Sequence, residues 1–176
     1  MELYLTPNGR IDQPTYWRAV LILFAISAAL SVVSAFVSPF LGFAGLIVIW
    51  PWIAVHVKRF HDAGKTGWLT IAMVVLAIVV SMVAGLMLPA LFGIDQVALQ
   101  QEMQREIERA SSGDASAALS TAMEASKKIA QAQLLPSILS TGIVTGIVGA
   151  VMGLFKTDPN DNIYGPGPGG ASVAFN

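Results

Sequence analysis

The residues best suited to chemistry lie in one short polar segment between two apolar stretches. This segment, 58–67, contains His61 followed by Asp62, and His56 precedes it. A carboxylate can orient an imidazole for acid–base catalysis, but adjacent residues rarely make that contact well, and no serine or second carboxylate accompanies the pair. Two histidines without further ligands also form a poor metal site. We therefore predict no catalytic residue, no metal and no cofactor.

The cations of this segment suggest that it binds an anion. A Lys or Arg beside a membrane surface attracts anionic head groups by about 1 kcal/mol. A lipid phosphate would be the natural ligand. The residues proposed for this anion or head-group site are Lys58, Arg59, His61, Asp62 and Lys65.

A structural role for the same segment is the alternative. Arg59 would then pair with Asp62, while Gly64 and Gly67 would form the turn. Trp68 would anchor the apolar stretch that follows at the membrane surface. Both interpretations remain open from the sequence.

The elements around this segment are apolar and long. The chain has 176 residues, of which 55% are hydrophobic and 12% charged, against about 25% charged in a typical soluble domain. No Asp, Glu, Lys or Arg occurs in 19–57, 66–94 or 129–155. Because a spanning helix needs roughly 20 apolar residues, the first stretch can hold two helices and the others one each. This pattern predicts an all-α, polytopic membrane bundle of about four transmembrane helices and excludes a soluble enzyme.

The predicted organisation follows from these stretches. The spanning segments are expected at about 19–37, 41–57, 68–92 and 134–155, and a re-entrant second segment would reduce the crossings to three. The divisions are an N-terminal segment at 1–17, three membrane helices with the basic loop 58–67 at 18–93, an extramembrane hairpin at 94–133, a fourth membrane helix at 134–156, and a flexible tail at 157–176.

The segment 94–133 has a different composition, with ten charged residues. Leu99, Met103 and Ile107 are spaced for one helix face, and a break is expected at 111–114. We predict a helical hairpin. Its apolar stripe either joins the two helices or contacts a partner.

A second pattern lies in the last apolar stretch, where four glycines are spaced by four, three and four residues. Small residues let helix backbones approach closely in lipid. The stripe serves packing either within the monomer or against a partner subunit. Its members are Gly142, Gly146, Gly149 and Gly153.

Aromatic residues and cations indicate where the chain meets the membrane surface. The predicted interface anchors are Tyr16, Trp17, Trp50, Trp52 and Trp68. Four crossings place both termini on one side with the basic loop. That side carries six cations against four on the hairpin side, so the positive-inside tendency places both termini in the cytoplasm.

Several short motifs resemble one family. They are Asn-Gly-Arg-Ile at 8–11, Lys-Arg-Phe-His-Asp at 58–62, Gly-Trp at 67–68, and an ending with Asn162, Tyr164 and Gly165-Pro166. Together they resemble the domain-of-unknown-function 805 (DUF805) family of small bacterial inner-membrane proteins. Lys and Phe stand at 58 and 60 where the family usually has Arg and Leu, and 94–133 looks like an insertion. The resemblance implies an inner-membrane location, and it implies no activity and no catalytic residues.

The functional hypothesis is an accessory or structural interaction subunit of a membrane complex. Charged groups, which pumps usually need inside the membrane, are missing from the apolar stretches. A passive small-solute transporter or channel is one alternative, and an anionic-lipid-binding protein is another.

Expected partners are membrane lipids, anionic at the cytoplasmic face, and a membrane protein or a second copy of the chain. A net charge of −1 argues against nucleic acid. Hydroxyls that could line a path are those of Ser27, Ser31, Ser34, Thr141 and Thr145.

Overall fold

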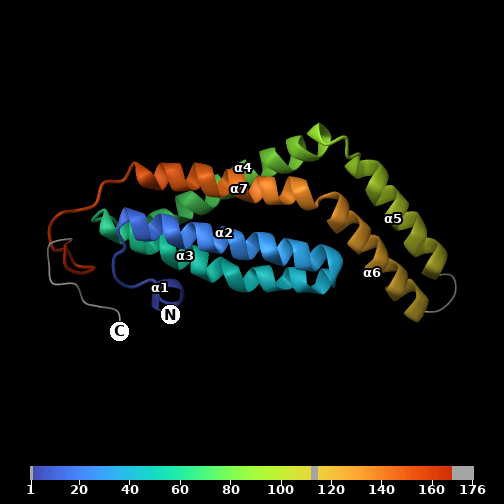
Figure 1. The fold of residues 1–176 in the computed structure, drawn as a ribbon, viewed down its shortest axis with the longest axis horizontal. Coiled ribbons are helices and arrows are strands. Elements are labelled where there is room, and N and C mark those ends of the chain that lie inside the picture. Colours follow the sequence, from blue (N-terminus) through green and yellow to red (C-terminus); the bar gives the residue numbers. More distant parts are fainter. Residues whose placement is uncertain (1, 112–114, 168–176) are drawn as a thin grey trace.

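The computed structural model describes residues 2–111 and 115–167, which form an all-α bundle with a projecting hairpin (Figure 1). The long apolar helices are α2 (Gln13–Phe36), α3 (Gly45–Asp62), α4 (Thr70–Leu91) and α7 (Leu134–Gly153). Two 3-10 helices, η1 (Pro39–Ala44) and η2 (Gly67–Leu69), lead into α3 and α4. The short helix α1 (Glu2–Leu5) packs against α3. The predicted fold class is confirmed.

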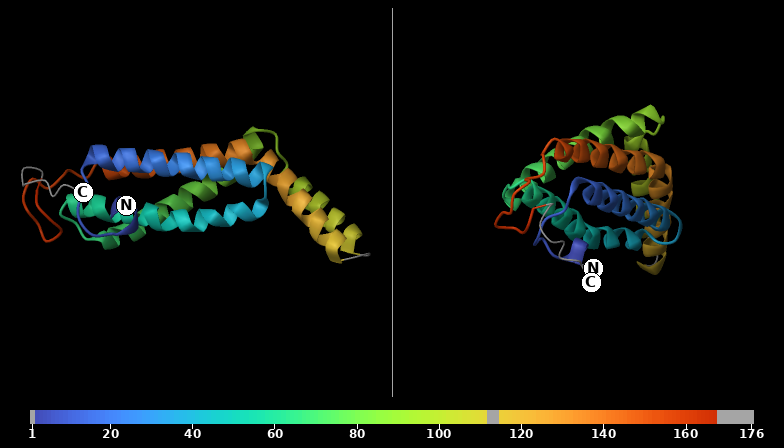
Figure 2. Two further views of the ribbon diagram at one scale, coloured as in Figure 1. Left: turned by 60° about the horizontal axis from the view of Figure 1, so that its bottom comes forward. Right: turned by 60° about the vertical axis from the view of Figure 1, so that its left-hand side comes forward.

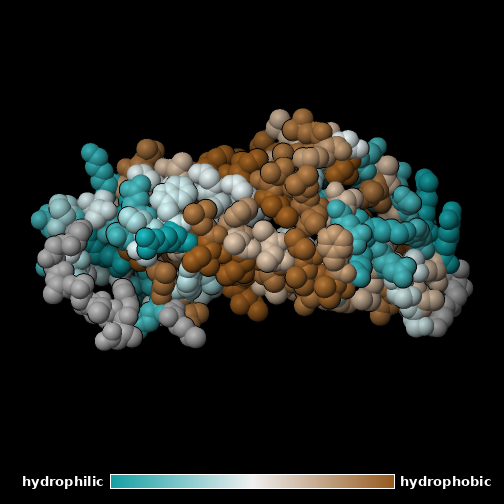
Figure 3. Space-filling view, viewed as in Figure 1, coloured by the Kyte–Doolittle hydropathy of each residue, from teal (hydrophilic) through white to brown (hydrophobic). Residues whose placement is uncertain are grey.

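The surface of the bundle is that of a membrane protein. Leu86 and Leu91 on α4 are 77% and 75% exposed, and an apolar belt separates hydrophilic surfaces at the two ends (Figure 3). Within the described chain, four segments are long and apolar enough to cross a membrane: Gln13–Phe36, Pro39–Asp62, Gly67–Leu91 and Leu134–Gly153. Such a surface is stable in lipid and a liability in water.

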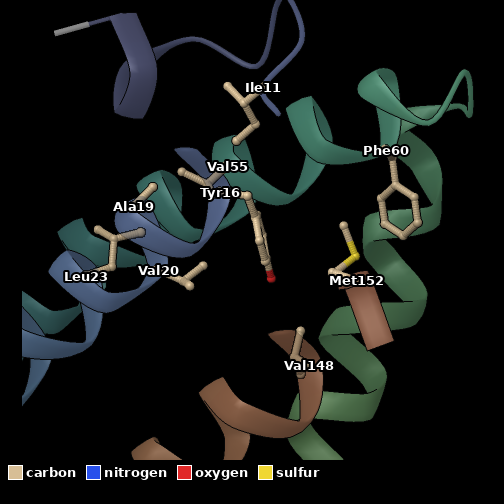
Figure 4. Packing of buried hydrophobic residues seen from close by; sticks show 9 residues of the cluster. All are labelled: Ile11, Tyr16, Ala19, Val20, Leu23, Val55, Phe60, Val148 and Met152. Carbon is tan, nitrogen blue, oxygen red and sulfur yellow. The ribbon is translucent and has the colours of Figure 1, made fainter. Parts of the chain in front are cut away.

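The helices pack in a definite order. Helix α7 lies against both α2 and α4, and α2 also packs on α3, whereas contact between α3 and α4 is sparse. Helix α1 and residues 157–167 lie at one end of the bundle and the hairpin at the other (Figure 2). The buried apolar cluster comprises Ile11, Tyr16, Ala19, Val20, Leu23, Val55, Phe60, Val148 and Met152 (Figure 4).

The basic segment does not begin as a loop. Lys58–Asp62 complete α3, because the first residue suited to a left-handed turn is Gly64, at φ +66°. The amide of Lys65 donates to the Phe60 carbonyl at 2.9 Å, and that of Gly64 donates to the His61 carbonyl at 3.1 Å. These two bonds form a Schellman motif. The turn is therefore confirmed at Gly64, in the second half of the predicted loop 58–67, whereas Gly67 begins η2.

The hairpin consists of α5 (Gln96–Ser111) and α6 (Ala115–Ala132). Asp95 caps α5 by accepting from the amides of Val97 and Ala98 at 3.0 and 2.9 Å. The Leu99, Met103 and Ile107 stripe is half-buried where α5 packs along α6, so it joins the two helices. The centre of the predicted break, 112–114, lies outside the described residues.

The glycine stripe of α7 packs mainly within the chain. A Cβ at Gly149 would lie 2.5 Å from the Trp17 ring, and one at Gly142 would lie 3.6 Å from the Phe24 ring. A Cβ at Gly153 would lie 3.4 Å from the Gln13 side-chain amide. Three of the four glycines therefore face α2, whereas Gly146 meets nothing within 4 Å.

The predicted interface anchors occupy different surroundings. Tyr16 is fully buried, with its hydroxyl donating to His56 Nε2 at 3.1 Å, so its position differs from that of an exposed anchor. Trp17 is half-buried against α7, and Trp52 packs against the His56 ring. Trp50 donates from Nε1 to the Leu5 carbonyl at 2.8 Å. Trp68, at 78% exposed, is the most open of the set.

Replacing Gly149 by leucine should destabilise the bundle, whereas replacing Gly146 by leucine should not. Gly149→Leu forces the Trp17 ring out of its place and should destabilise the bundle by about 1–3 kcal/mol through overpacking. Gly146→Leu adds a side chain in open space and should leave the thermal unfolding of the monomer in detergent unchanged. Equal melting temperatures for the two variants would contradict this packing. If only Gly146→Leu dissolves an oligomer, the open glycine faces a second subunit.

Candidate functional site

A buried ionic cluster stands at the end of α3, where the motifs of the sequence converge. We call Arg10, Arg59, Asp62 and Thr157 the Asp62 cluster. Arg59, whose side chain is 0% exposed, donates to Asp62 Oδ2 and to the Phe155 carbonyl, and donates to Thr157 Oγ1 at 3.1 Å. The Thr157 hydroxyl in turn donates to Asp62 Oδ2 at 2.7 Å. The predicted Arg59–Asp62 pair is confirmed.

Arg10 brings the N-terminal segment into the same cluster. Its guanidinium donates to Asp62 Oδ1 at 3.4 Å and to the Asp62 carbonyl at 3.2 Å. It also donates to the carbonyls of Asp158 and Asn160 at 2.5 and 2.8 Å. One side chain thus joins residues before α2, at the end of α3 and after α7.

The described part of the predicted flexible tail is packed. The amide of Asp158 donates to the Asp62 carbonyl at 2.7 Å, and the Asn162 side-chain amide donates to the His61 carbonyl at 3.2 Å. The Asn160 backbone amide, followed by the Asn162 side chain, lowers the pKa of Asp158 below its ordinary value. Hydrogen bonds rather than apolar burial hold residues 157–167, which is why composition alone predicted a flexible segment. Residues 168–176 lie outside the described chain.

Lys58 contacts the beginning of the chain. Its Nζ donates to the Glu2 carbonyl at 2.5 Å and to the Leu3 carbonyl at 3.3 Å. The side chain is buried, with 2% of the residue exposed. An ammonium group placed on backbone carbonyls in this way fixes α1 against α3.

The two histidines are also held by backbone. His56 donates from Nδ1 to the Trp52 carbonyl at 2.7 Å and accepts from Tyr16. His61 Nδ1 contacts the Gly9 carbonyl at 3.1 Å, and the ring stacks on Tyr164 with centroids 3.7 Å apart. The Asp62 carboxylate takes its hydrogen bonds from Arg59, Arg10 and Thr157, so it orients two guanidinium groups and no imidazole.

The proposed head-group residues therefore divide into two groups. Lys58, Arg59, His61 and Asp62 are buried in contacts with the chain itself. Lys65 is exposed, with its Nζ 5.9 Å from the centre of the Phe155 ring. Anion binding at this site stays a prediction, in which Lys65 is the cation accessible to a ligand.

Sequence reasoning did not identify Arg10, Thr157 and Asp158 as parts of this site. Arg10 stands in the first family motif, but no spacing rule connects it to Asp62, which is 52 residues away. The hydroxyls proposed to line a solute path donate to backbone carbonyls, mostly of their own helices. They belong to Ser27, Ser31, Ser34, Thr141 and Thr145.

The lipid-facing helices and the polar end that joins both termini define a polytopic α-helical membrane protein. The chain matches the protein family of unknown function DUF805 over residues 4–166, nearly its full length. It belongs to that family, and the segment 94–133 lies within the matched range. Comparison with curated proteins and with solved structures found no match.

Removing one charge at the centre of the Asp62 cluster should loosen the whole end of the bundle. Asp62→Asn leaves two buried guanidinium groups without their carboxylate, which should cost about 3–5 kcal/mol. We expect a lower melting temperature in detergent and faster proteolysis of the tail near Ile163, which is 90% exposed.

The matched control is Glu124→Gln, which removes one carboxylate from an exposed position on α6. It should melt like the parent protein. A melting temperature of Asp62→Asn equal to that of the control would mean that the cluster contributes little to stability.

Proposed function

We propose that this protein is a multi-pass protein of the bacterial inner membrane with both termini in the cytoplasm. The support is the charge distribution at the two ends of the bundle. The end with the termini carries Arg10, Arg18, Lys58, Arg59, Lys65 and Lys156. The hairpin carries Arg105, Arg109, Lys127 and Lys128, spread over a longer segment. Cations near helix ends favour the cytoplasmic side.

The orientation can be tested with single cysteines, because the chain has none of its own. Ile163→Cys reports the tail and Leu119→Cys the hairpin, and both positions are exposed, at 90% and 59%. In spheroplasts, an impermeant maleimide should label only the hairpin cysteine, and the tail cysteine should react after permeabilisation. Labelling in the reverse order would invert the proposed topology.

Within this membrane, the proposed role is that of an accessory subunit that presents its hairpin to a protein partner. The observation that carries the proposal is that the hairpin is a folded and fixed unit. Its apolar stripe is used between α5 and α6, and Gln131 donates to the Ala35 carbonyl at 3.1 Å, where α6 packs against α2 and η1. A binding surface held in one orientation loses less entropy on association.

The outward face of the hairpin supports a polar partner surface. A concavity of about 430 Å³ on α5 carries both signs of charge, and its lining is Ala98, Gln101, Glu102, Arg105, Glu106 and Arg109. Of these residues, Glu106 also pairs with Lys128 of α6 at 3.4 Å. Mixed charges on an interface select the partner and its register more than they add affinity. The accessory role is favoured over a passive channel because the candidate path hydroxyls already donate to backbone carbonyls.

Replacing residues 96–132 by a flexible Gly-Ser linker tests the accessory role. The bundle should still fold, because α4 and α7 pack against each other without the hairpin, although its melting temperature should fall as the contacts of α6 with α2 and η1 are lost. A partner that is crosslinked in native membranes and identified by mass spectrometry should be lost.

A subtler variant keeps the hairpin folded. Exchanging Glu102 and Arg105 (Glu102→Arg with Arg105→Glu) preserves composition and net charge while reversing the pattern on the outward face. It should weaken the same crosslink. If the same proteins are crosslinked at equal yield in both variants, the hairpin does not take part in the interaction.

A further inference from the structure

A groove opens between α3 and α4 at the same end of the bundle as the Asp62 cluster. It has a volume of about 480 Å³, within the range of ligand pockets. Ile53, Val57, Ile71 and Val74 form its apolar walls, and we call it the α3–α4 groove. It lies where these two helices make little contact. Gly67 lets η2 approach α3 closely at this place, since a Cβ there would lie 2.7 Å from Val57 and 3.0 Å from His61 Nε2.

The polar end of the groove holds a hydroxyl without a partner. Thr70 lines the groove and is 5% exposed, and its Oγ1 makes no hydrogen bond within the described chain. A buried hydroxyl left in this state costs about 1–3 kcal/mol. A ligand with a hydrogen-bonding end would relieve that cost.

His61 supplies an acceptor at the same end. Its Nδ1 lies 3.1 Å from the Gly9 carbonyl, and because a carbonyl only accepts, Nδ1 carries the hydrogen. In the neutral ring Nε2 is then a lone-pair acceptor, placed beside Gly67. Stacking on Tyr164 fixes the ring plane. A ligand must therefore bring a donor to Nε2.

We propose that the α3–α4 groove binds one acyl chain of an anionic glycerophospholipid with free head-group hydroxyls, of the phosphatidylglycerol type. The apolar walls face the hydrocarbon region and accept the chain. A glycerol hydroxyl donates to His61 Nε2, and the exposed ammonium of Lys65, next to the groove residue Thr66, attracts the phosphate. This lipid site is independent of the proposed accessory role, because it lies at the opposite end from the hairpin.

The test counts lipid that stays bound to the full chain. Protein purified in mild detergent is offered equal amounts of phosphatidylglycerol, phosphatidylethanolamine and phosphatidylcholine with the same acyl chains, and native mass spectrometry measures what remains. We expect one phosphatidylglycerol to be retained preferentially. Val74→Trp fills the groove and should reduce its retention at least about tenfold, which is a loss of roughly 1.4 kcal/mol.

The matched control is the neighbouring Val75→Trp, which adds the same ring outside the groove at a position that is 54% exposed. It should bind like the parent chain. Thr70→Val keeps the shape of the side chain and removes the hydroxyl, so retention should fall roughly fivefold. If Val74→Trp does not purify as a folded protein, Thr70→Val decides alone.

Four outcomes would overturn the proposal. Equal retention of the three lipids would mean no recognition of the head group. Preferential retention of phosphatidylethanolamine would mean that the group donating to His61 Nε2 is an ammonium and not a head-group hydroxyl. Equal loss in Val74→Trp and Val75→Trp, or no loss in Thr70→Val, would place the retained lipid outside the groove.

Discussion

The structure depends on one buried carboxylate that binds two guanidinium groups. Asp62 receives Arg59 and Arg10, each of which contributes a charge with almost no exposure. Such charges are expensive to desolvate, and they are tolerated only where each finds a partner of opposite sign and further hydrogen bonds. Thr157 and the carbonyls of Phe155 and Asp158 supply those bonds. The segment before α2, the end of α3 and the segment after α7 are therefore held together, because each buried charge needs a partner.

This requirement limits what the basic segment can bind. An arginine that already donates to a carboxylate, a hydroxyl and a carbonyl has little capacity for an external phosphate. From the sequence, the cations of the motif at 58–62 were predicted to be available to a ligand. In the structure, they are occupied by contacts within the chain. At the margin of the cluster, Lys65 is exposed and His61 lines the α3–α4 groove. A ligand site at this end is adjacent to the cluster and rigidly positioned by it.

The sequence predicts well which segments span the membrane, but it predicts poorly which face of each helix is buried, and one physical reason explains both. Length and absence of charge identify a membrane helix, and both are local properties. The face that a helix buries is visible only when one side is polar, and α2, α4 and α7 are apolar on every side. The sequence therefore predicted that Tyr16 faces the membrane surface, whereas it is buried. It also left open which helix Gly149 would meet.

The contacts that the sequence missed are those with large separation along the chain. Lys58 reaches a carbonyl 56 residues away, and Arg10 one 155 residues away. No spacing rule could reveal these pairs, yet they fix both flanking segments to the end of α3. Asp62 is tied to Thr157 and Asp158, which follow α7, so the end of α3 is fixed against the tail. Helix α4 packs mainly on α7, and a groove stays open between α3 and α4. The polar cluster and the apolar groove thus share the end of α3, where Asp62 belongs to the cluster and His61 lines the groove.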